Sequence, residues 1–252
     1  MADAHFEHPR LVALYDPLDP VRADLDYYAA LAAEFGARDV LDIGCGTGVL
    51  ACRLASEGRA VTGLDPALAS LEVARRKPFA DRVRWIHGTV DALPGEFTAD
   101  LVTMTGNVAQ VFVSDDDWSA VLRAAATVLA RGGRLVFETR DPGRRAWAEW
   151  NRRDSYLSQA VPGAGTVTAW NDVTDVSGEL VTFRTTYAFE SDGAVLVSDS
   201  TLRFRGREAV ARSLTAAGFS VDEVRDAPDR PGREFVFIAS PRGQAATRKL
   251  PR

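Results

Sequence analysis

The clearest pattern in the chain is an alternation of short apolar runs with stretches in which apolar residues recur at helical spacing. The runs Asp39–Ile43, Arg59–Leu64 and Ala99–Val102 belong to this series, and Arg134–Glu138 closes it after an Arg131–Gly133 turn. Short apolar runs of this kind predict buried strands, and the helical spacing predicts helices between them. Because strands that alternate with helices form a parallel sheet covered on both faces, the predicted fold class is α/β.

The alternation stops after residue 140. A Trp-rich segment at residues 144–151 predicts a helix, and three runs rich in Val, Thr and aromatic residues follow it. The residues between the runs, Ser177-Gly178 and Ser191-Asp192-Gly193, are typical of turns. We therefore expect an antiparallel β meander with strands at Thr166–Val176, Leu180–Glu190 and Ala194–Phe204.

The central run of this meander alternates between two faces, as a strand does. One face carries the larger apolar side chains, so we expect it to be buried against a partner. Its residues are Val181, Phe183, Thr185, Tyr187 and Phe189, whereas Thr182, Arg184, Thr186 and Glu190 share the other face.

The core pattern resumes after the meander. Residues 207–217 predict a helix that Gly218 ends, and residues 219–224 and 234–240 predict two last strands. The chain is thus expected to hold one elaborated core with an insertion. Its predicted parts are an N-terminal helical cover at 1–36, a core at 37–145 and 205–240, an inserted helix and meander at 146–204, and a tail at 241–252.

The turn after the first predicted strand carries the most specific chemistry. Gly44, Gly46 and Gly48 stand at every second position, and glycine there leaves room for a ligand against the backbone. Dinucleotide-binding turns have the spacing G-x-G-x-x-G, which places a pyrophosphate on a helix N-terminus. This chain has G-x-G-x-G preceded by Asp42, whose carboxylate would repel a pyrophosphate and suits a ligand with an ammonium group. The pattern favours S-adenosylmethionine, which has no phosphate, over NAD.

A second acid lies at a useful distance from this turn. Asp65 ends the next predicted strand, about 20 residues later, where a carboxylate can accept both hydroxyl groups of a ribose. Asp65 before Pro66 also suits a helix N-cap, and the two roles are compatible.

Residues 40–48 resemble motif I of the class I S-adenosylmethionine-dependent methyltransferases, and the resemblance extends closely over residues 36 to 140. It implies a seven-stranded Rossmann-like sheet that ends in an antiparallel hairpin. It also implies that Asp65 holds the ribose, that Asp91 approaches the adenine amino group, and that Tyr15 reaches the cofactor from the N-terminal cover. The cofactor-binding residues that it predicts are Tyr15, Asp42, Gly44, Gly46, Gly48, Asp65, Pro66, Asp91, Ala92 and Thr105.

Composition narrows the function. The net charge of −5 and the pI near 5.3 disfavour a nucleic-acid substrate, which needs a basic surface. With two cysteines and three histidines, neither a disulfide framework nor a zinc site is expected. No run reaches 18 apolar residues and the first residues lack the pattern of a signal peptide, so we expect a cytoplasmic protein that does not interact with membranes.

The acceptor of the methyl group is predicted only by position. The carboxyl ends of the fourth and fifth predicted strands open onto the crevice of such a fold, which makes Asn107, Arg140 and Trp147 acceptor-pocket candidates. Arg140 could grip a carboxylate, or could pair with Asp141 or Glu138 at the surface. Metal-dependent relatives carry an Asp at the end of the fourth strand, and Met104, Thr105 and Asn107 stand there instead, so no catalytic metal is expected.

The sequence is compatible with two functions. The first is methyl transfer to a nitrogen or oxygen of a small molecule, with nitrogen favoured because the sequence shows no convincing general base. The second is a catalytically silent S-adenosylmethionine-binding protein with a regulatory or interaction role. The inserted meander would cover the acceptor, form a homodimer contact, or only extend the fold.

Overall fold

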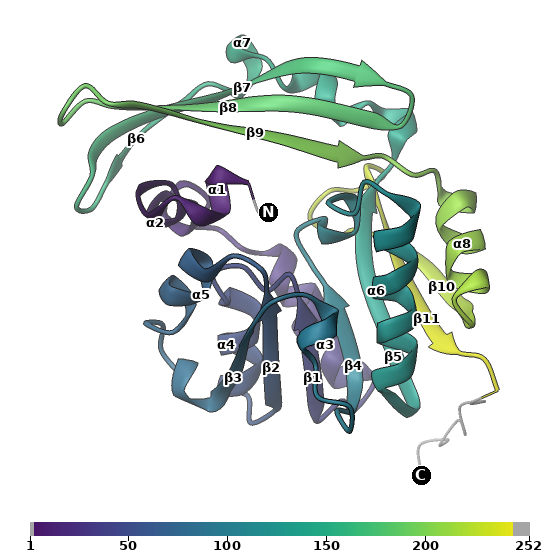
Figure 1. The fold of residues 1–252 in the computed structure, drawn as a ribbon. Helices are drawn as coiled ribbons and strands as arrows, with labels where there is room; N and C mark the ends of the chain where they lie inside the picture. The colour runs from purple at the N-terminus through teal and green to yellow at the C-terminus, as the bar shows by residue number, and fades with distance from the viewer. Residues whose placement is uncertain (1–2, 244–252) are drawn as a thin grey trace.

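The computed structural model describes residues 3–243, so most of the predicted tail lies outside the described part. The described chain forms two separate sheets (Figure 1). The larger has seven strands in the order β10-β11-β5-β4-β1-β2-β3. Their bounds are β1 Asp39–Ile43, β2 Ala60–Asp65, β3 Val83–His87, β4 Ala99–Met104, β5 Leu129–Arg140, β10 Phe219–Asp226 and β11 Glu234–Pro241.

The directions of these strands confirm the predicted α/β class. Strands β1 to β5 pair in parallel, whereas β11 runs antiparallel to β5 and to β10, which gives the predicted hairpin at the end of the sheet. The order reverses between β1 and β4, so the connections leave the sheet on opposite sides there. In such sheets, ligands bind outside the carboxyl ends of the strands at this reversal.

Helices cover both faces of the sheet, as predicted. Side chains of α3 and α4 pack on one face, and side chains of α6 and α8 pack on the other. Within residues 3–243, no helix has both the length and the apolar content needed to cross a bilayer. The helix bounds are α1 Ala4–Glu7, α2 Pro9–Leu18, α3 Asp24–Glu34, α4 Val49–Ser56, α5 Leu68–Ala74, α6 Asp115–Val128, α7 Arg152–Ser155 and α8 Arg207–Ala216, with 3-10 turns η1 Ala80–Arg82, η2 Val90–Ala92 and η3 Val108–Gln110.

Strand β5 begins earlier than the sequence pattern predicts. The expected Arg131–Gly133 turn lies inside the strand, because Leu129 already pairs with Ala99 of β4 and the next pair is Arg134 with Leu101. The extra residues on the β5 side form a bulge, in which Gly132 has a φ of +87°. The prediction of a turn between the helix and the strand was therefore wrong, because residues 131–133 form a bulge inside β5.

The insertion differs from its prediction in two ways. The smaller sheet has four antiparallel strands rather than three, because Leu157–Val161 adds an edge strand. The Trp-rich segment is not one helix but two 3-10 turns, which Arg145 separates with a φ of +48°. The predicted burial of one face of β8 is confirmed by Val181, Tyr187 and Phe189. The bounds are η4 Pro142–Arg144, η5 Ala146–Glu149, β6 Leu157–Val161, β7 Gly165–Ser177, β8 Leu180–Phe189 and β9 Val195–Arg203.

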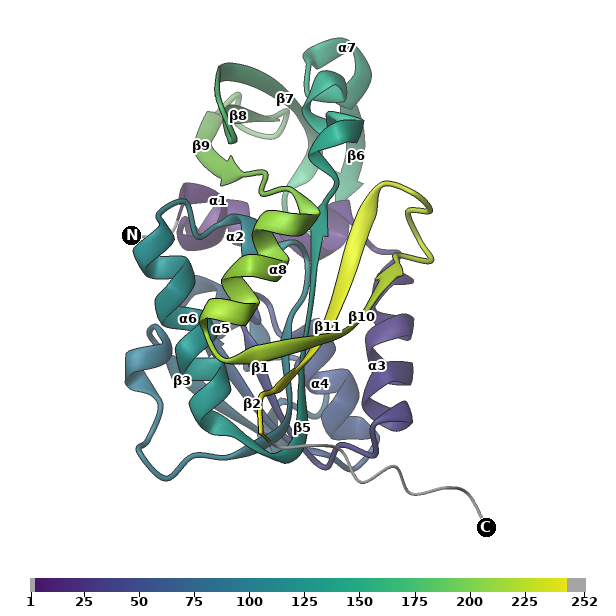
Figure 2. The same ribbon diagram turned by 90° about the vertical axis from the view of Figure 1, so that its right-hand side faces the viewer.

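The N-terminal helices join the insertion to the core. Leu11 and Leu14 of α2 form a small apolar cluster with inward side chains of the insertion, among them Val167 and Phe189. Figures 1 and 2 show α1 and α2 between the inserted sheet and the carboxyl edge of the large sheet. Helix α3 lies lower and packs on α4 within the main core. The carboxyl edge is thus roofed by two layers, α1 with α2 and then the inserted sheet.

We predict that Gly63→Ala destabilises the fold. A Cβ at Gly63 of β2 would lie 2.7 Å from the Trp85 ring and 2.9 Å from the Cys45 sulfur. Overpacking of this kind costs about 1–3 kcal/mol of unfolding free energy. Urea denaturation measures the change, and Gly206→Ala is the matched control, because its Cβ meets nothing within 4 Å. Equal stability of the two variants would contradict this account of the β2–β3 packing.

Candidate functional site

The turn between β1 and α4 has the backbone that its glycines predict. Gly44, Gly46 and Gly48 have φ values of +69°, +52° and +75°, in the left-handed region that favours glycine. A Cβ built on Gly46 would meet nothing within 4 Å, so this part of the turn presents bare backbone to open space. A ligand can therefore approach the main chain closely at the reversal of strand order.

Asp65 at the end of β2 holds this turn in place. One carboxylate oxygen accepts the Gly46 N–H at 2.7 Å, and the other accepts the Ala67 N–H at 2.8 Å. The side chain is only 7% exposed, and burial raises the pKa of its carboxyl group although both hydrogen bonds oppose that shift. The predicted ribose ligand is thus also the residue that shapes the glycine turn, and its oxygens keep lone pairs for further donors.

Asp42 at the end of β1 is more deeply buried, at 1% exposure. The Thr103 hydroxyl on β4 donates to one of its oxygens at 2.8 Å. Burial raises the pKa of Asp42 to about 7, and the charge of Asp65 adds to the shift. A cationic group beside Asp42 would favour its ionised form, whereas a phosphate would face two buried acids.

The other predicted cofactor residues, Pro66, Asp91, Ala92 and Thr105, follow the strands β2, β3 and β4 along the chain. Thr105 follows β4 and is buried, whereas Pro66, Asp91 and Ala92 are exposed. Asp91 lies in η2, which begins after Gly88 and Thr89 beyond the end of β3, and its side chain is exposed. Their roles in binding remain predictions.

Helix α2 reaches the glycine turn from above. The Thr47 hydroxyl donates to Asp16 at 2.7 Å, and Lys77 pairs with the other oxygen of the same carboxylate. Tyr15, the neighbouring residue, stacks edge-on to His5 with ring centroids 5.2 Å apart, and burial raises the pKa of its phenol. The N-terminal segment therefore covers the edge where the cofactor is predicted, although a contact of Tyr15 with that cofactor remains a prediction.

Two of the three acceptor-pocket candidates come together. The Asn107 side chain, 3% exposed, donates to Glu234 at 3.2 Å, and Arg140 lies 3.8 Å from the same Glu234 oxygen. The expected pairing of Arg140 with Asp141 or Glu138 was wrong. Its guanidinium donates instead to Gln110 at 2.9 Å, because the β5 side chain points inward beside η3. Trp147 lies apart from them and packs edge-on to Phe204 at 4.5 Å.

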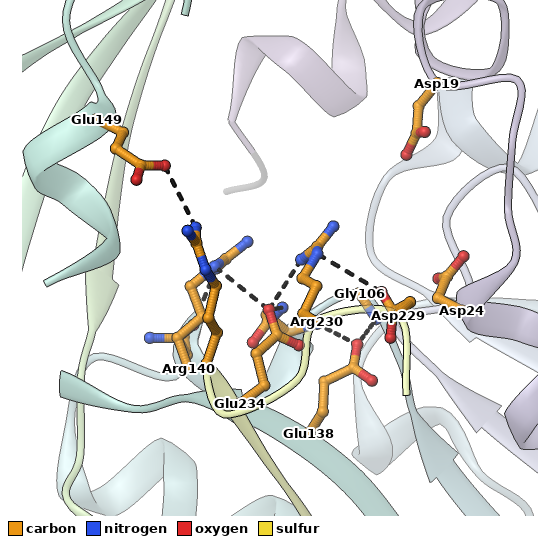
Figure 3. A network of polar contacts seen from close by, with 12 residues as sticks. Asp19, Asp24, Gly106, Glu138, Arg140, Glu149, Asp229, Arg230 and Glu234 are labelled. Atoms are coloured by element: carbon orange, nitrogen blue, oxygen red, sulfur yellow. Dashed lines mark hydrogen bonds and ion pairs between the residues drawn. The ribbon is translucent and has the colours of Figure 1, made fainter. Parts of the chain in front are cut away.

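Two buried acids, Glu138 and Glu234, were not singled out from the sequence. They lie near the end of β5 and at the start of β11, are 5% and 4% exposed, and stand side by side in Figure 3. One Glu138 oxygen accepts the N–H groups of Gly106, at 2.5 Å, and Asn107, at 3.1 Å. A weak signal existed for Glu138, since an acid closing a buried parallel strand points to the ligand edge. Glu234 gave none, because only the pairing of β11 with β5 brings it there.

Burial raises the pKa of Glu138 to about 8, and the negative charge of Glu234 adds to the rise. Glu234 itself is compensated by Arg230, whose guanidinium donates to it at 2.8 Å. The two acids therefore differ in how their charge is compensated. Glu234 has a direct cationic partner, whereas Glu138 accepts hydrogen bonds from backbone N–H groups. Among residues 3–243, no group of three His, Cys, Asp or Glu side chains is arranged to hold a metal ion.

The raised pKa predicts a pH dependence of stability. Glu138 titrates near pH 8 when folded and near 4.5 when unfolded, so its ionisation opposes folding increasingly as pH rises through this window. The unfolding free energy of Glu138→Gln should therefore rise relative to that of the wild type between pH 5 and pH 8.5, by up to about 4 kcal/mol, since one pKa unit is about 1.4 kcal/mol. Urea denaturation at both values checks this. The exposed Glu223→Gln should show no such gain, and a flat difference for Glu138→Gln would count against its raised pKa.

Sequence comparison agrees with the motifs. Residues 40–133 match the family model of a methyltransferase domain. Two ubiquinone biosynthesis O-methyltransferases, from Sodalis glossinidius and Escherichia coli O127:H6, are 31% identical to this chain over 151 and 149 residues. Each alignment covers 58% of this chain, and 57% and 60% of the respective relatives, so the chain spans less than two thirds of their length.

Solved structures share the fold over most of the chain. A sugar N-methyltransferase from Streptoalloteichus sp. has a TM-score of 0.73 at 22% identity, covering 90% of this chain and 92% of its own. An amino pentose methyltransferase from Micromonospora echinaspora has a TM-score of 0.68 at 22% identity, covering 89% and 96%. These similarities show that residues 40–133 match a methyltransferase domain and that the chain has the fold of the solved methyltransferases, in agreement with its strand order.

Proposed function

We propose that this chain transfers a methyl group from S-adenosylmethionine to a nitrogen or oxygen of a small molecule. The observation that carries the proposal is the carboxyl edge of the large sheet, where bare glycine backbone lies between two buried acids, Asp42 and Asp65. These two carboxylates can accept hydrogen bonds from ribose hydroxyl groups and attract a positively charged ligand. The site is unsuited to a pyrophosphate, which needs uncompensated N–H donors and no neighbouring carboxylate.

The residues present fit S-adenosylmethionine in their chemistry. Asp42 would receive the ammonium group, Asp65 would accept from the ribose, and Asp91 would meet the adenine amino group. When bound, the cofactor supplies a methyl group already activated on a sulfonium. The chain then needs to align a nucleophile with that methyl group and exclude water, and such alignment can account for much of the rate enhancement.

The roof over this edge supports a small acceptor. Helices α1 and α2 and the inserted sheet lie above the carboxyl ends of the strands (Figure 2), which restricts access for a large polymer. The net charge of −5 likewise disfavours nucleic acid. The similar proteins are named for ubiquinone biosynthesis, a sugar and an amino pentose, all of which are small molecules.

An active transferase is favoured over a silent cofactor-binding protein. The buried acids Glu138 and Glu234 beside the cofactor edge are costly to fold, and binding of the cofactor alone gives them no role. A cytoplasmic location and a homodimer contact through the meander remain predictions. Val195 and Val197, exposed on the edge strand β9, are where we would look for such a contact.

Loss of Asp65 tests the cofactor site. We predict that Asp65→Ala weakens S-adenosylmethionine binding at least tenfold, about 1.4 kcal/mol, because it removes the ribose acceptor and releases the Gly46 N–H. Isothermal titration calorimetry measures the affinity on folded protein.

Asp100→Ala is the matched control. The Asp100 carboxylate also accepts two backbone N–H groups, those of Arg38 at 2.9 Å and Asp39 at 3.1 Å, but at the opposite edge of the sheet. Its loss should affect stability and leave the affinity unchanged. Equal affinities for wild type and Asp65→Ala would mean that the cofactor does not bind at this edge.

A further inference from the structure

The acceptor side of the site holds two buried acids, Glu138 and Glu234, and two arginines, Arg140 and Arg230, whose charges reach both acids. Glu138 and Glu234 come from neighbouring strands and face the N-terminal segment, where Asp24 begins α3 (Figure 3). The charge of Asp24 reaches Glu138 strongly enough to contribute to its raised pKa. Asp24 is itself paired with Arg22, whose guanidinium donates to it at 2.9 and 3.1 Å, so the attraction of a cation to this space depends on which of the carboxylates has no paired cation.

Glu234 already has its countercharge. Arg230 donates to it at 2.8 Å, the Asn107 amide donates at 3.2 Å, and Arg140 lies at 3.8 Å. Glu138 is different, because no guanidinium or ammonium group of residues 3–243 pairs with it. Its Oε1 accepts the Gly106 and Asn107 N–H groups, and no hydrogen bond from the described residues reaches Oε2. Oε2 is therefore the oxygen available to a ligand.

A second acceptor atom beside it also lacks a donor. Asn107 Oδ1 is fully buried and has no hydrogen-bond partner among the described residues, although the Asn107 amide nitrogen is paired with Glu234. A buried carbonyl oxygen without a partner costs about 1–3 kcal/mol. Asn107 Oδ1 is enclosed by the protein, so Glu138 Oε2 is the oxygen that can take an N–H or O–H donor from a ligand. An ammonium group carries three such donors and a positive charge, whereas a neutral hydroxyl carries one donor and no charge.

This acid site adjoins the cofactor edge through the loop after β4. Thr103, near the end of β4, donates to Asp42 on one side, and Gly106 and Asn107 donate to Glu138 on the other. Glu138 and Asp42 therefore flank the same loop. A ligand atom held by Glu138 lies next to the edge where the methyl donor is predicted.

We propose, resting on the methyltransferase function above, that the acceptor is an amine bound as an ammonium ion and that Glu138 takes its proton. Glu138 Oε2 accepts one proton from the ammonium group, which leaves a neutral amine with a free electron pair. That pair forms the new N–C bond while the C–S bond of the methyl donor breaks, and the electrons of the broken bond remain on sulfur. The product leaves as a methylated ammonium ion, and the proton on Glu138 passes to solvent.

The raised pKa of Glu138 suits this task. A carboxylate with an ordinary pKa would hold the proton of an ammonium ion too weakly, whereas one near 8 can accept it close to neutral pH. A bound ammonium ion favours the ionised carboxylate and lowers this pKa, but the burial that raises it persists, so Glu138 stays a stronger base than an ordinary carboxylate. Glu138 thereby binds the acceptor as an anion and then becomes its base.

Carbon-13 NMR of the carboxyl groups tests the binding step on the full chain. The sample contains S-adenosylhomocysteine, and Glu138→Gln and Glu234→Gln identify the resonances. Cyclohexylamine and cyclohexanol serve as probes matched in shape, at constant ionic strength. We expect the Glu138 resonance to titrate near pH 8 and its midpoint to fall by one unit or more with the amine but not with the alcohol. An ordinary midpoint near 4.5, or the same response to both probes or to neither, would overturn the proposal.

Transfer assays test the chemical step. With labelled S-adenosylmethionine and a panel of amines with their hydroxyl analogues, methylation should favour amines. Glu138→Gln should lower kcat by about 10²–10⁴-fold and remove the limb near pH 8 from the pH profile of kcat/KM, which reports the free enzyme, while Glu138→Asp should restore part of both. Glu223→Gln should match the wild type. A purely structural Glu138 would leave the pH profile unmoved and would contradict the proposal.

Measurement of cofactor binding distinguishes a failure of the methyltransferase function from a failure of the amine assignment. Calorimetry with S-adenosylmethionine on wild type and Glu138→Gln should give equal affinities. If the wild type binds no cofactor, the proposed function fails. If cofactor binds but hydroxyl compounds are methylated in preference to amines, only the amine assignment fails.

Discussion

The site depends on backbone N–H groups that hold acids at the carboxyl edge of a parallel sheet. Asp65 accepts the N–H of Gly46 and that of Ala67, which fixes the glycine turn around an open stretch of main chain. Glu138 of β5, three strands away from β2 in the sheet, is held in the same way by the N–H groups of Gly106 and Asn107. Because hydrogen bonds rather than cationic side chains offset the burial of these carboxylates, their charge stays available to a cationic ligand.

Much of this edge follows from local sequence. Alternate glycines after a short apolar run are informative because three positive φ values within five residues favour glycine at each of those positions. The roles of Asp42 and Asp65 could also be predicted from local sequence. Each lies at the carboxyl end of a buried strand, and parallel strands bring their carboxyl ends to one edge of the sheet. The last two strands and the alternation of β8 also follow from patterns only a few residues long, whereas the antiparallel pairing of those two strands was implied by the family resemblance.

The acceptor side could not be derived in this way, because it is assembled by long-range pairing. Glu234 reaches Arg140 only through the antiparallel register of β11 with β5, and nothing near Glu234 in the chain marks that register. The bulge of β5 and the edge strand β6 were missed for a related reason. Gly132 satisfies a turn and a bulge equally well, and a five-residue edge strand with mixed polarity has little pattern of its own. Arg145, with its positive φ, broke the helix expected around the tryptophans.

The proposed function requires that the carboxyl ends of β1 and β2 bind a positively charged nucleoside without a phosphate. Calorimetric titration of the folded chain with S-adenosylmethionine, S-adenosylhomocysteine and NADH tests it most directly. The buried acids Asp42 and Asp65 predict binding of both sulfur nucleosides and no detectable heat from NADH. Tight binding of NADH, with no response to either sulfur compound, would contradict the account.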